Sequence, residues 1–134
     1  MTEHPPITLF PQGAPGETEP MQEIENPIHI KVANQPVHIL GDVSIPTITF
    51  YPAPHHNNTG ATLIVNPGGG YDVLAYDLEG TEVCERFNTL GINCVLLKYR
   101  VPRRKGQPKH QAPLQDLQRA IAYTRAHAKE WQLD

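Results

Sequence analysis

The stretch from Ala61 to Tyr76, ATLIVNPGGGYDVLAY, constrains the fold of this chain more than any other. Its first five residues form a short apolar and partly β-branched run, which is typical of a strand buried on both faces. Asn66 and Pro67 end this run, and a helical pattern begins about ten residues later. The glycines between them are Gly68, Gly69 and Gly70. The spacing therefore predicts a strand-to-helix turn built from glycine, which can adopt positive φ and let a ligand approach the backbone closely.

Such a turn would present backbone N–H groups at the mouth of a sheet. Groups placed there stabilise an anion or an oxyanion. The alternative is a tight turn with no ligand, because glycines punctuate loops of every kind. The residues around the turn favour the ligand-binding interpretation.

Length and composition indicate a single domain without a nucleic-acid partner. The chain has 134 residues, of which 39% are hydrophobic, and its net charge is −3. Its basic residues form no stripe apart from Arg103, Arg104 and Lys105, which lie close to Gly106 and Pro108. We expect these three side chains on a solvated loop, and nucleic-acid binding is not predicted.

The sequence also bears on compartment and cysteine chemistry. No apolar run reaches membrane-spanning length and no signal peptide is visible, so no membrane partner is predicted. As written the protein is expected in the cytoplasm; secretion or a periplasmic location stays open if the native N-terminus is missing. Cys84 and Cys94 are expected on a helix face and in a strand, as small apolar fillers, although a disulfide between them is also open.

The first half of the chain predicts an antiparallel entry into a sheet. Residues 1–27 are expected to be irregular surface structure, with one short extended piece at residues 7–10. Residues 28–40 alternate apolar and polar side chains, which predicts a half-buried strand with Ile28, Ile30 and Val32 on one face. Residues 43–51 predict a second strand with Ile48 and Phe50 inward, and Pro46 indicates an edge strand or a bulge.

The second half predicts a strand–helix–strand unit and a further helix. Residues 77–90 have helical spacing, Gly91 stands where a C-terminal cap belongs, and residues 92–99 form another apolar run. This arrangement predicts parallel strands joined by a right-handed crossover. Residues 112–131 predict an amphipathic helix. Its apolar positions are Leu114, Leu117, Ile121, Thr124, Ala128 and Trp131.

Several motifs resemble one known group of proteins. These are PGGGY at 67–71, Glu79-Gly80, LKYRVP at 97–102 and the run APLQDLQRAIAYTRAHAKEWQLD at 112–134, with LFPQGAPGE at 9–17 in addition. In this order they resemble α/β-hydrolase fold esterases of the bacterial acetyl-xylan esterase or xylanase-like esterase type. The resemblance implies an α/β fold, a mostly parallel sheet with flanking helices and antiparallel N-terminal strands. Residues 1–27 would be an irregular N-terminal segment. Residues 28–134 would be an incomplete α/β-hydrolase domain that ends before the nucleophile strand.

The resemblance also implies a role for the glycine-rich loop. In the family this loop supplies backbone N–H groups to the oxyanion hole, which would place Gly68, Gly69, Gly70 and Tyr71 around the oxyanion. The related lipase and esterase motif begins with histidine where this chain has Pro67, so the donor pair stays open. Tyr71 is expected either as a wall of the acyl or alcohol pocket or as a side chain that packs the loop down.

No member of a catalytic triad is recognisable in this chain. The family places its nucleophile in a later G-x-S-x-G elbow, whereas Ser44 is the only serine here and has no flanking glycines. The implied function is therefore an N-terminal fragment of a serine carboxylesterase that acts on small acyl esters or acetylated polysaccharide. We expect the 134-residue chain alone to be inactive. Neither a cofactor nor a metal is predicted, and His55-His56 is interpreted as surface.

Two other functions stay open. The strand at residues 61–65 is expected near the middle of the sheet, and its next parallel neighbour is missing. A non-catalytic binding or interaction module could therefore pair with a partner chain, or self-associate, through this open sheet edge. A deacetylase or peptidase on the same fold is a third interpretation.

The charged residues near the glycine-rich loop have structural interpretations. Arg100 is expected to pair with Asp116 rather than to bind substrate, because buried charges need partners. Asp116 and Glu79 are each expected in the first turn of a helix, where the helix dipole favours a carboxylate. Asp72 and Asp77 flank the loop and could line a pocket.

Overall fold

A mixed four-stranded sheet forms the centre of the computed structural model, which describes residues 4–134. Its strand order is β1-β6-β9-β7. The bounds are β1 Ile7–Thr8, β6 Thr47–Tyr51, β9 Asn93–Lys98 and β7 Thr62–Val65. β7 and β9 pair in parallel, as the strand–helix–strand pattern predicts, whereas β1–β6 and β6–β9 are antiparallel. The expected antiparallel N-terminal strands are confirmed, but this sheet is not mostly parallel.

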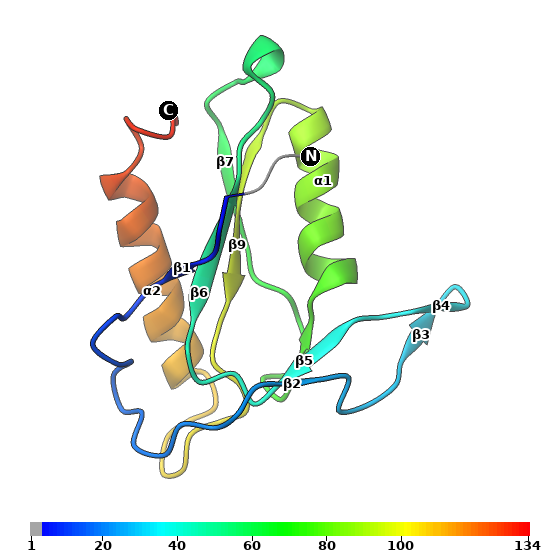
Figure 1. Ribbon diagram of the computed structural model, residues 1–134, viewed down its shortest axis with the longest axis vertical. Helices are drawn as coiled ribbons and strands as arrows, with labels where there is room; N and C mark the ends of the chain where they lie inside the picture. Colours follow the sequence, from blue (N-terminus) through cyan, green and yellow to red (C-terminus); the bar gives the residue numbers. More distant parts are fainter. Residues whose placement is uncertain (1–3) are drawn as a thin grey trace.

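The two helices cover opposite faces of this sheet (Figure 1). α1 (Glu82–Thr89) follows a five-residue π-helical turn, η2 (Asp77–Thr81), and α2 is Gln111–Ala126. Side chains of β9 alternate between two separate cores. Val95 and Leu97 pack in the core that includes Ala120 of α2, whereas Cys94 and Leu96 pack in the core that includes Cys84 of α1. The period of two along a strand thus explains why β9 is apolar throughout.

β7 lies at the edge of this sheet in the described chain, with one side unpaired, as the missing parallel neighbour predicts. Its sole paired neighbour within residues 4–134 is β9, and its first three residues are half-buried. The interpretation of this run as buried on both faces is therefore correct for Val65 and wrong for Thr62 to Ile64. Pro46 indicated that residues 43–51 form an edge strand or contain a bulge, but β6 is a central strand between β1 and β9. Pro46 lies just before β6 begins, so it does not interrupt the pairing.

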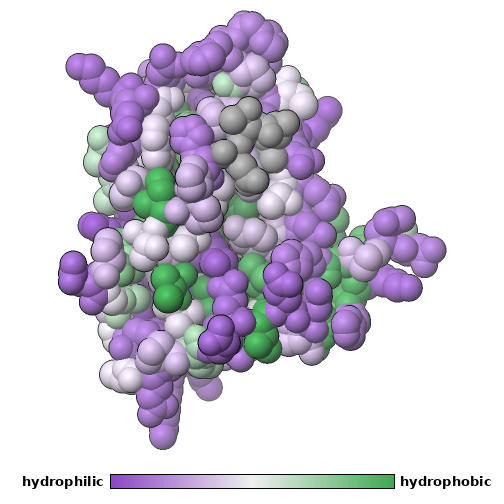
Figure 2. Space-filling model, viewed as in Figure 1, coloured by the Kyte–Doolittle hydropathy of each residue, from purple (hydrophilic) through white to green (hydrophobic). Residues whose placement is uncertain are grey.

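The segment from residue 28 to residue 40 differs most from the prediction. It forms a two-stranded hairpin, β3 (Lys31–Val32) and β4 (Gln35–Pro36), that projects from the body (Figures 1 and 2). Ile28, Ile30 and Val32 are 48%, 41% and 46% exposed, so the expected half-buried face does not exist. Ala33 and Asn34 adopt positive φ at the tip, which reverses the chain before a longer strand can form.

A second small sheet joins the region after the hairpin to the glycine-rich loop. Its order is β2-β5-β8, with bounds Ile24–Glu25, Ile39–Gly41 and Leu74–Ala75. All pairings in it are antiparallel. β8 directly follows the loop and is buried, so the far end of the loop is tied to β5.

The N-terminal segment is packed more tightly than expected. β1 lies within the predicted extended piece, but Leu9 is fully buried in the main core. Arg104, expected on a solvated loop, is also buried: it donates to Glu17 Oε2 at 2.8 Å and to Val43 O at 2.6 Å. The ion pair with Glu17 provides the partner that a buried guanidinium needs, which sequence spacing could not reveal.

Cys84 and Cys94 form a disulfide bond between α1 and β9, with Cα atoms 5.3 Å apart. Both cysteines are buried, as the interpretation of small apolar fillers requires, but they are not free thiols. The disulfide that the sequence left open is the one that forms. A helix and the next strand bring the two Cβ atoms together because the crossover packs α1 onto β9. The separation of ten residues gave no framework signal.

Reduction of this disulfide should destabilise the protein. The chain-entropy model gives about 2 to 3 kcal/mol for a loop of this size, because the open loop raises the entropy of the unfolded chain. Urea denaturation of oxidised and reduced protein measures the difference in unfolding free energy. Denaturation of the double variant Cys84→Ala/Cys94→Ala with and without reductant is the control, and its two curves should coincide.

Candidate functional site

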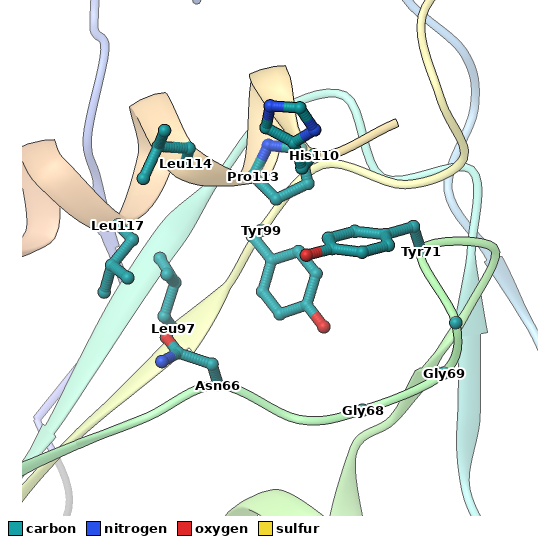
Figure 3. Close-up of a pocket in the computed structure, with 11 residues that line it drawn as sticks. Asn66, Gly68, Gly69, Tyr71, Leu97, Tyr99, His110, Pro113, Leu114 and Leu117 are labelled. Atoms are coloured by element: carbon teal, nitrogen blue, oxygen red, sulfur yellow. The ribbon is translucent and has the colours of Figure 1, made fainter. Parts of the chain in front are cut away.

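A cavity of about 590 Å³ opens between the glycine-rich loop, the end of β9 and the start of α2 (Figure 3). The loop and strand contribute both polar and apolar groups, and the helix contributes mostly apolar ones. The lining residues are Asn66, Gly68, Gly69, Gly70, Tyr71, Leu97, Tyr99, His110, Pro113, Leu114 and Leu117. The Tyr71 ring extends from the loop across the cavity toward Tyr99 and the start of α2 (Figure 3). All four residues that the sequence singled out therefore lie on one wall.

Hydrogen bonds inside the loop decide which way its N–H groups point. The Gly68 carbonyl accepts from Ala75 N–H at 2.9 Å, and the Gly69 carbonyl accepts from Asp72 and Val73 N–H at 3.1 and 3.3 Å. In a planar trans peptide the N–H points opposite to the C=O. The N–H groups of Gly69 and Gly70 are therefore directed away from the loop interior. Neither has an acceptor anywhere in residues 4–134.

Gly69 is required by the close approach of the backbone. A Cβ atom there would lie 1.8 Å from the Val73 carbonyl oxygen, which no side chain can tolerate. Gly70 has φ of +65° and open space where a Cβ would stand. Tyr71, also at positive φ, is 38% exposed, so it does not pack the loop down as a buried staple would.

Tyr99 joins the loop to the main sheet. It follows β9, is 8% exposed, and its hydroxyl donates a hydrogen bond to the Pro67 carbonyl. Burial, together with the nearby Tyr71 and Glu79, raises the pKa of Tyr99 to about 12. The phenol therefore stays protonated, and remains a donor, throughout the neutral range.

The raised pKa of Tyr99 predicts a late step in an alkaline titration. Absorbance at 295 nm should show one of the five tyrosines ionising near pH 12, and Tyr99→Phe should remove that step. Because the folded state holds the proton more tightly, the contribution of Tyr99 to stability is complete below pH 10 and is lost as pH rises toward 12. A wild-type titration in which every tyrosine ionises near pH 10 would contradict this assignment.

The acidic residues around the loop have separate partners. Glu79 Oε1 accepts the Gly68 N–H at 3.2 Å, so this carboxylate contacts the loop directly rather than serving only the helix dipole. Asp77 Oδ1 accepts from the backbone N–H groups of His38 and Leu78 at 2.9 and 2.7 Å. Asp77 lines a different cavity, beside the hairpin, and neither Asp77 nor Asp72 lines the cavity of Figure 3.

Arg100 and Asp116 form the predicted ion pair, away from the cavity. Arg100 Nη2 lies 2.9 Å from Asp116 Oδ1, and both side chains are fully buried. Arg100 also donates its backbone N–H to the same carboxylate at 2.9 Å. Burial raises the pKa of the Asp116 carboxyl, and the hydrogen bonds and charge of Arg100 oppose that rise. Since α2 begins at Gln111, Asp116 lies beyond its first turn and the helix-dipole explanation is wrong.

Ser44 does not have the surroundings of a nucleophile. It is 5% exposed, and its Oγ accepts from Met21 N–H at 2.8 Å and from Arg104 Nη2 at 3.3 Å. A serine nucleophile needs a base within hydrogen-bond reach, and both of these partners are donors. Ser44 thus anchors the N-terminal segment.

Sequence reasoning missed the residues that complete the cavity: Asn66, Leu97, Tyr99, His110 and Pro113. Leu114 and Leu117 were expected on the apolar face of α2, and Leu114 is 46% exposed where it borders the cavity. His55 and His56 lie in an exposed 3-10 turn. In the part of the chain that the structure describes, no three His, Cys, Asp or Glu side chains gather in a way that could hold a metal.

The mixed sheet with a helix on each face is consistent with part of an α/β-hydrolase fold. Comparison with solved structures agrees. An acetyl ester-xyloside bifunctional hydrolase from Caldicellulosiruptor lactoaceticus matches with a TM-score of 0.55 and 33% identity, over 67% of this chain and 31% of that one. A lipase/esterase from Lactobacillus plantarum matches with a TM-score of 0.53 and 22% identity, over 85% of this chain and 41% of that one.

One curated protein is similar in sequence. Endo-1,4-beta-xylanase B from Butyrivibrio fibrisolvens is 32% identical over 72 residues, which is 54% of this chain and 11% of that protein. No protein-family model matches the chain. The resemblance to α/β-hydrolase fold esterases of the acetyl-xylan esterase type is confirmed, and the chain spans only 31% and 41% of the length of these two solved structures. Within residues 4–134 no helix combines the length and apolarity that crossing a membrane requires.

Proposed function

We propose that this chain supplies the oxyanion-binding loop of a serine carboxylesterase that acts on small acyl esters, acetyl esters of carbohydrate among them. The observation that carries the proposal is the pair of outward N–H groups on Gly69 and Gly70, which have no acceptor in the described chain and border a cavity. Two fixed donors beside a cavity stabilise the negative charge that develops on a carbonyl oxygen during acyl transfer.

The lining of the cavity supports an ester rather than a charged substrate. Leu97, Leu114 and Leu117 provide an apolar wall that suits a short acyl chain. Tyr71 and His110 provide polar groups at its border. The names of the structural neighbours, an acetyl ester-xyloside hydrolase and a lipase/esterase, agree with this substrate class.

In this proposal the nucleophile and its base come from polypeptide outside residues 1–134. The buried Ser44, with two donors on its hydroxyl, does not serve. An oxyanion hole without a nucleophile leaves only a small part of the catalytic effect. The 134-residue chain is therefore expected to hydrolyse p-nitrophenyl acetate no faster than its Ser44→Ala variant.

Binding of a small carboxylate tests the oxyanion role without requiring turnover. We expect sodium acetate, titrated at constant ionic strength, to shift the amide resonances of Gly69 and Gly70 in ¹⁵N-labelled protein. The amide of Gly106, which lies in an exposed turn far along the chain, is the internal control. Sodium chloride in place of acetate should shift none of the three. An acetate titration that leaves Gly69 and Gly70 unmoved overturns the proposal.

The open edge of β7 favours a second candidate, a non-catalytic module that takes up a strand from a partner chain or a second copy. β7 pairs with β9 on one side, and no strand in the described chain pairs with its other side. Unpaired backbone groups on an edge strand recruit further strands. Size-exclusion chromatography with light scattering distinguishes a monomer from an associated form. Thr62→Lys, at the half-buried start of this strand, should disperse an associated form if the edge mediates it.

A further inference from the structure

We propose that Tyr99 and Glu79 are positioning residues that hold the peptide group between Pro67 and Gly68 from opposite sides, an inference that rests on the proposed oxyanion role of the loop. The Tyr99 hydroxyl donates to the Pro67 carbonyl, and the Gly68 N–H donates to Glu79 Oε1 at 3.2 Å. The carbonyl and the N–H belong to one planar trans peptide, so they point in opposite directions. Together the two side chains fix the orientation of that plane.

This peptide group is the entry to the glycine-rich loop. The pyrrolidine ring restricts φ of Pro67, but ψ of Pro67 and both dihedrals of Gly68 are free to rotate in the absence of other contacts. A rotation there would change the direction of the Gly69 N–H group and, further along the loop, that of the Gly70 N–H group. The next peptide is held through the Gly68 carbonyl, which accepts from Ala75 N–H. With the bonds to Tyr99 and Glu79, two successive peptide groups at the start of the loop are fixed by hydrogen bonds.

The two positioning residues are themselves anchored in separate layers. Tyr99 directly follows β9 and belongs to the main core. Glu79 lies in η2, and the next residue, Gly80, is buried against Leu96 and Pro67, where an added Cβ would come within 3.0 and 3.2 Å of their side chains. This close packing brings η2 near enough for the Glu79 carboxylate to reach the loop.

The hydrogen bond to Glu79 also indicates which N–H groups of the loop are available to bind an oxyanion. Gly68 N–H is occupied by Glu79 and is therefore not available to an oxyanion. Gly69 and Gly70 remain as the pair that faces outward. Glu79 thus acts through the backbone of the loop: its carboxylate holds the Gly68 N–H and so fixes the orientation of the residues that would contact the ligand.

Backbone order in three variants tests this inference. We expect order parameters of about 0.85 for the Gly69 and Gly70 amides in the wild-type protein and below about 0.6 in Tyr99→Phe and Glu79→Ala. Glu79→Gln keeps an oxygen acceptor of the same reach, so it should behave as wild type. In the same samples the acetate dissociation constant should rise about three- to tenfold in Tyr99→Phe and Glu79→Ala and stay unchanged in Glu79→Gln.

The outcomes separate the positioning role from the proposed function. Unchanged loop order in both Tyr99→Phe and Glu79→Ala overturns the positioning role, whatever acetate does. Absence of acetate binding in the wild-type protein overturns the proposed function, whatever the loop does. Disorder that spreads equally to Gly106 would mean general destabilisation and also contradicts the positioning role. Glu79 is exposed, so its alanine variant should fold even if Tyr99→Phe does not.

Discussion

Replacement of Arg100 by methionine is expected to lower the free energy of unfolding by about 3 to 5 kcal/mol at pH 7.5. The substitution leaves the Asp116 carboxylate fully buried without its guanidinium partner. Burial already raises the pKa of Asp116, and the variant loses the charge that opposes this rise. The carboxyl should therefore take up a proton, so the loss should be smaller at pH 4 than at pH 7.5. Urea denaturation at the two pH values measures both effects.

Two further variants control the Arg100 experiment. Arg103 is exposed in the same loop, and Arg103→Met should change stability by less than about 0.5 kcal/mol. The double variant Arg100→Met/Asp116→Leu removes both charges, and it should recover part of the stability that the single variant loses. If the double variant were less stable than Arg100→Met, the loss in the single variant could not be due to a buried and unpaired Asp116 carboxylate.

Gly69→Ala is expected to abolish the acetate response of the glycine-rich loop. The added methyl group would overlap the Val73 carbonyl oxygen, so residues 68–73 must move. The displacement should cost about 1 to 3 kcal/mol of stability, as in other overpacked sites, and should weaken acetate binding at least tenfold. Urea denaturation and the amide titration measure the two effects on one sample.

Gly70→Ala is the matched control in the same loop. Its Cβ would meet no atom within 4 Å, and the only cost is positive φ, about 1 kcal/mol. Acetate binding should therefore change much less than in Gly69→Ala. Equal losses in the two variants would show that glycine content, rather than the contact with Val73, controls the loop.

Local patterns predicted the parts of the fold that depend on neighbours in sequence. The run at residues 61–65, the helix after it and the run at residues 92–99 gave the parallel pair β7–β9 and its crossover, because period and spacing specify such a unit. The Arg100–Asp116 pair followed from the need of a buried charge for a partner. The hairpin was missed since alternation alone cannot tell a buried strand from two short exposed ones separated by positive-φ residues.

The candidate site was predicted only in part, because only some of its residues carry a local sequence signal. The glycines and Tyr71 carry a local signal, and they do line one cavity. Tyr99 and His110 lie 28 and 39 residues beyond Tyr71 in the sequence, and only the tertiary fold brings them to the loop. A single tyrosine or histidine carries no sequence pattern of its own. The helix dipole already explained a carboxylate at position 79, so nothing in the sequence indicated the hydrogen bond between Glu79 and Gly68 N–H.

Because side chains of β9 alternate between two cores, the disulfide depends on the register of this strand. Cys94 faces α1, and its neighbour Val95 faces the other way. If β9 slipped by one residue against its partners, Cys94 would point toward α2 and its sulfur could not reach Cys84. The disulfide is therefore compatible with only one alignment of β9 in the folded state: a folded molecule with the strand slipped by one residue would leave both thiols free.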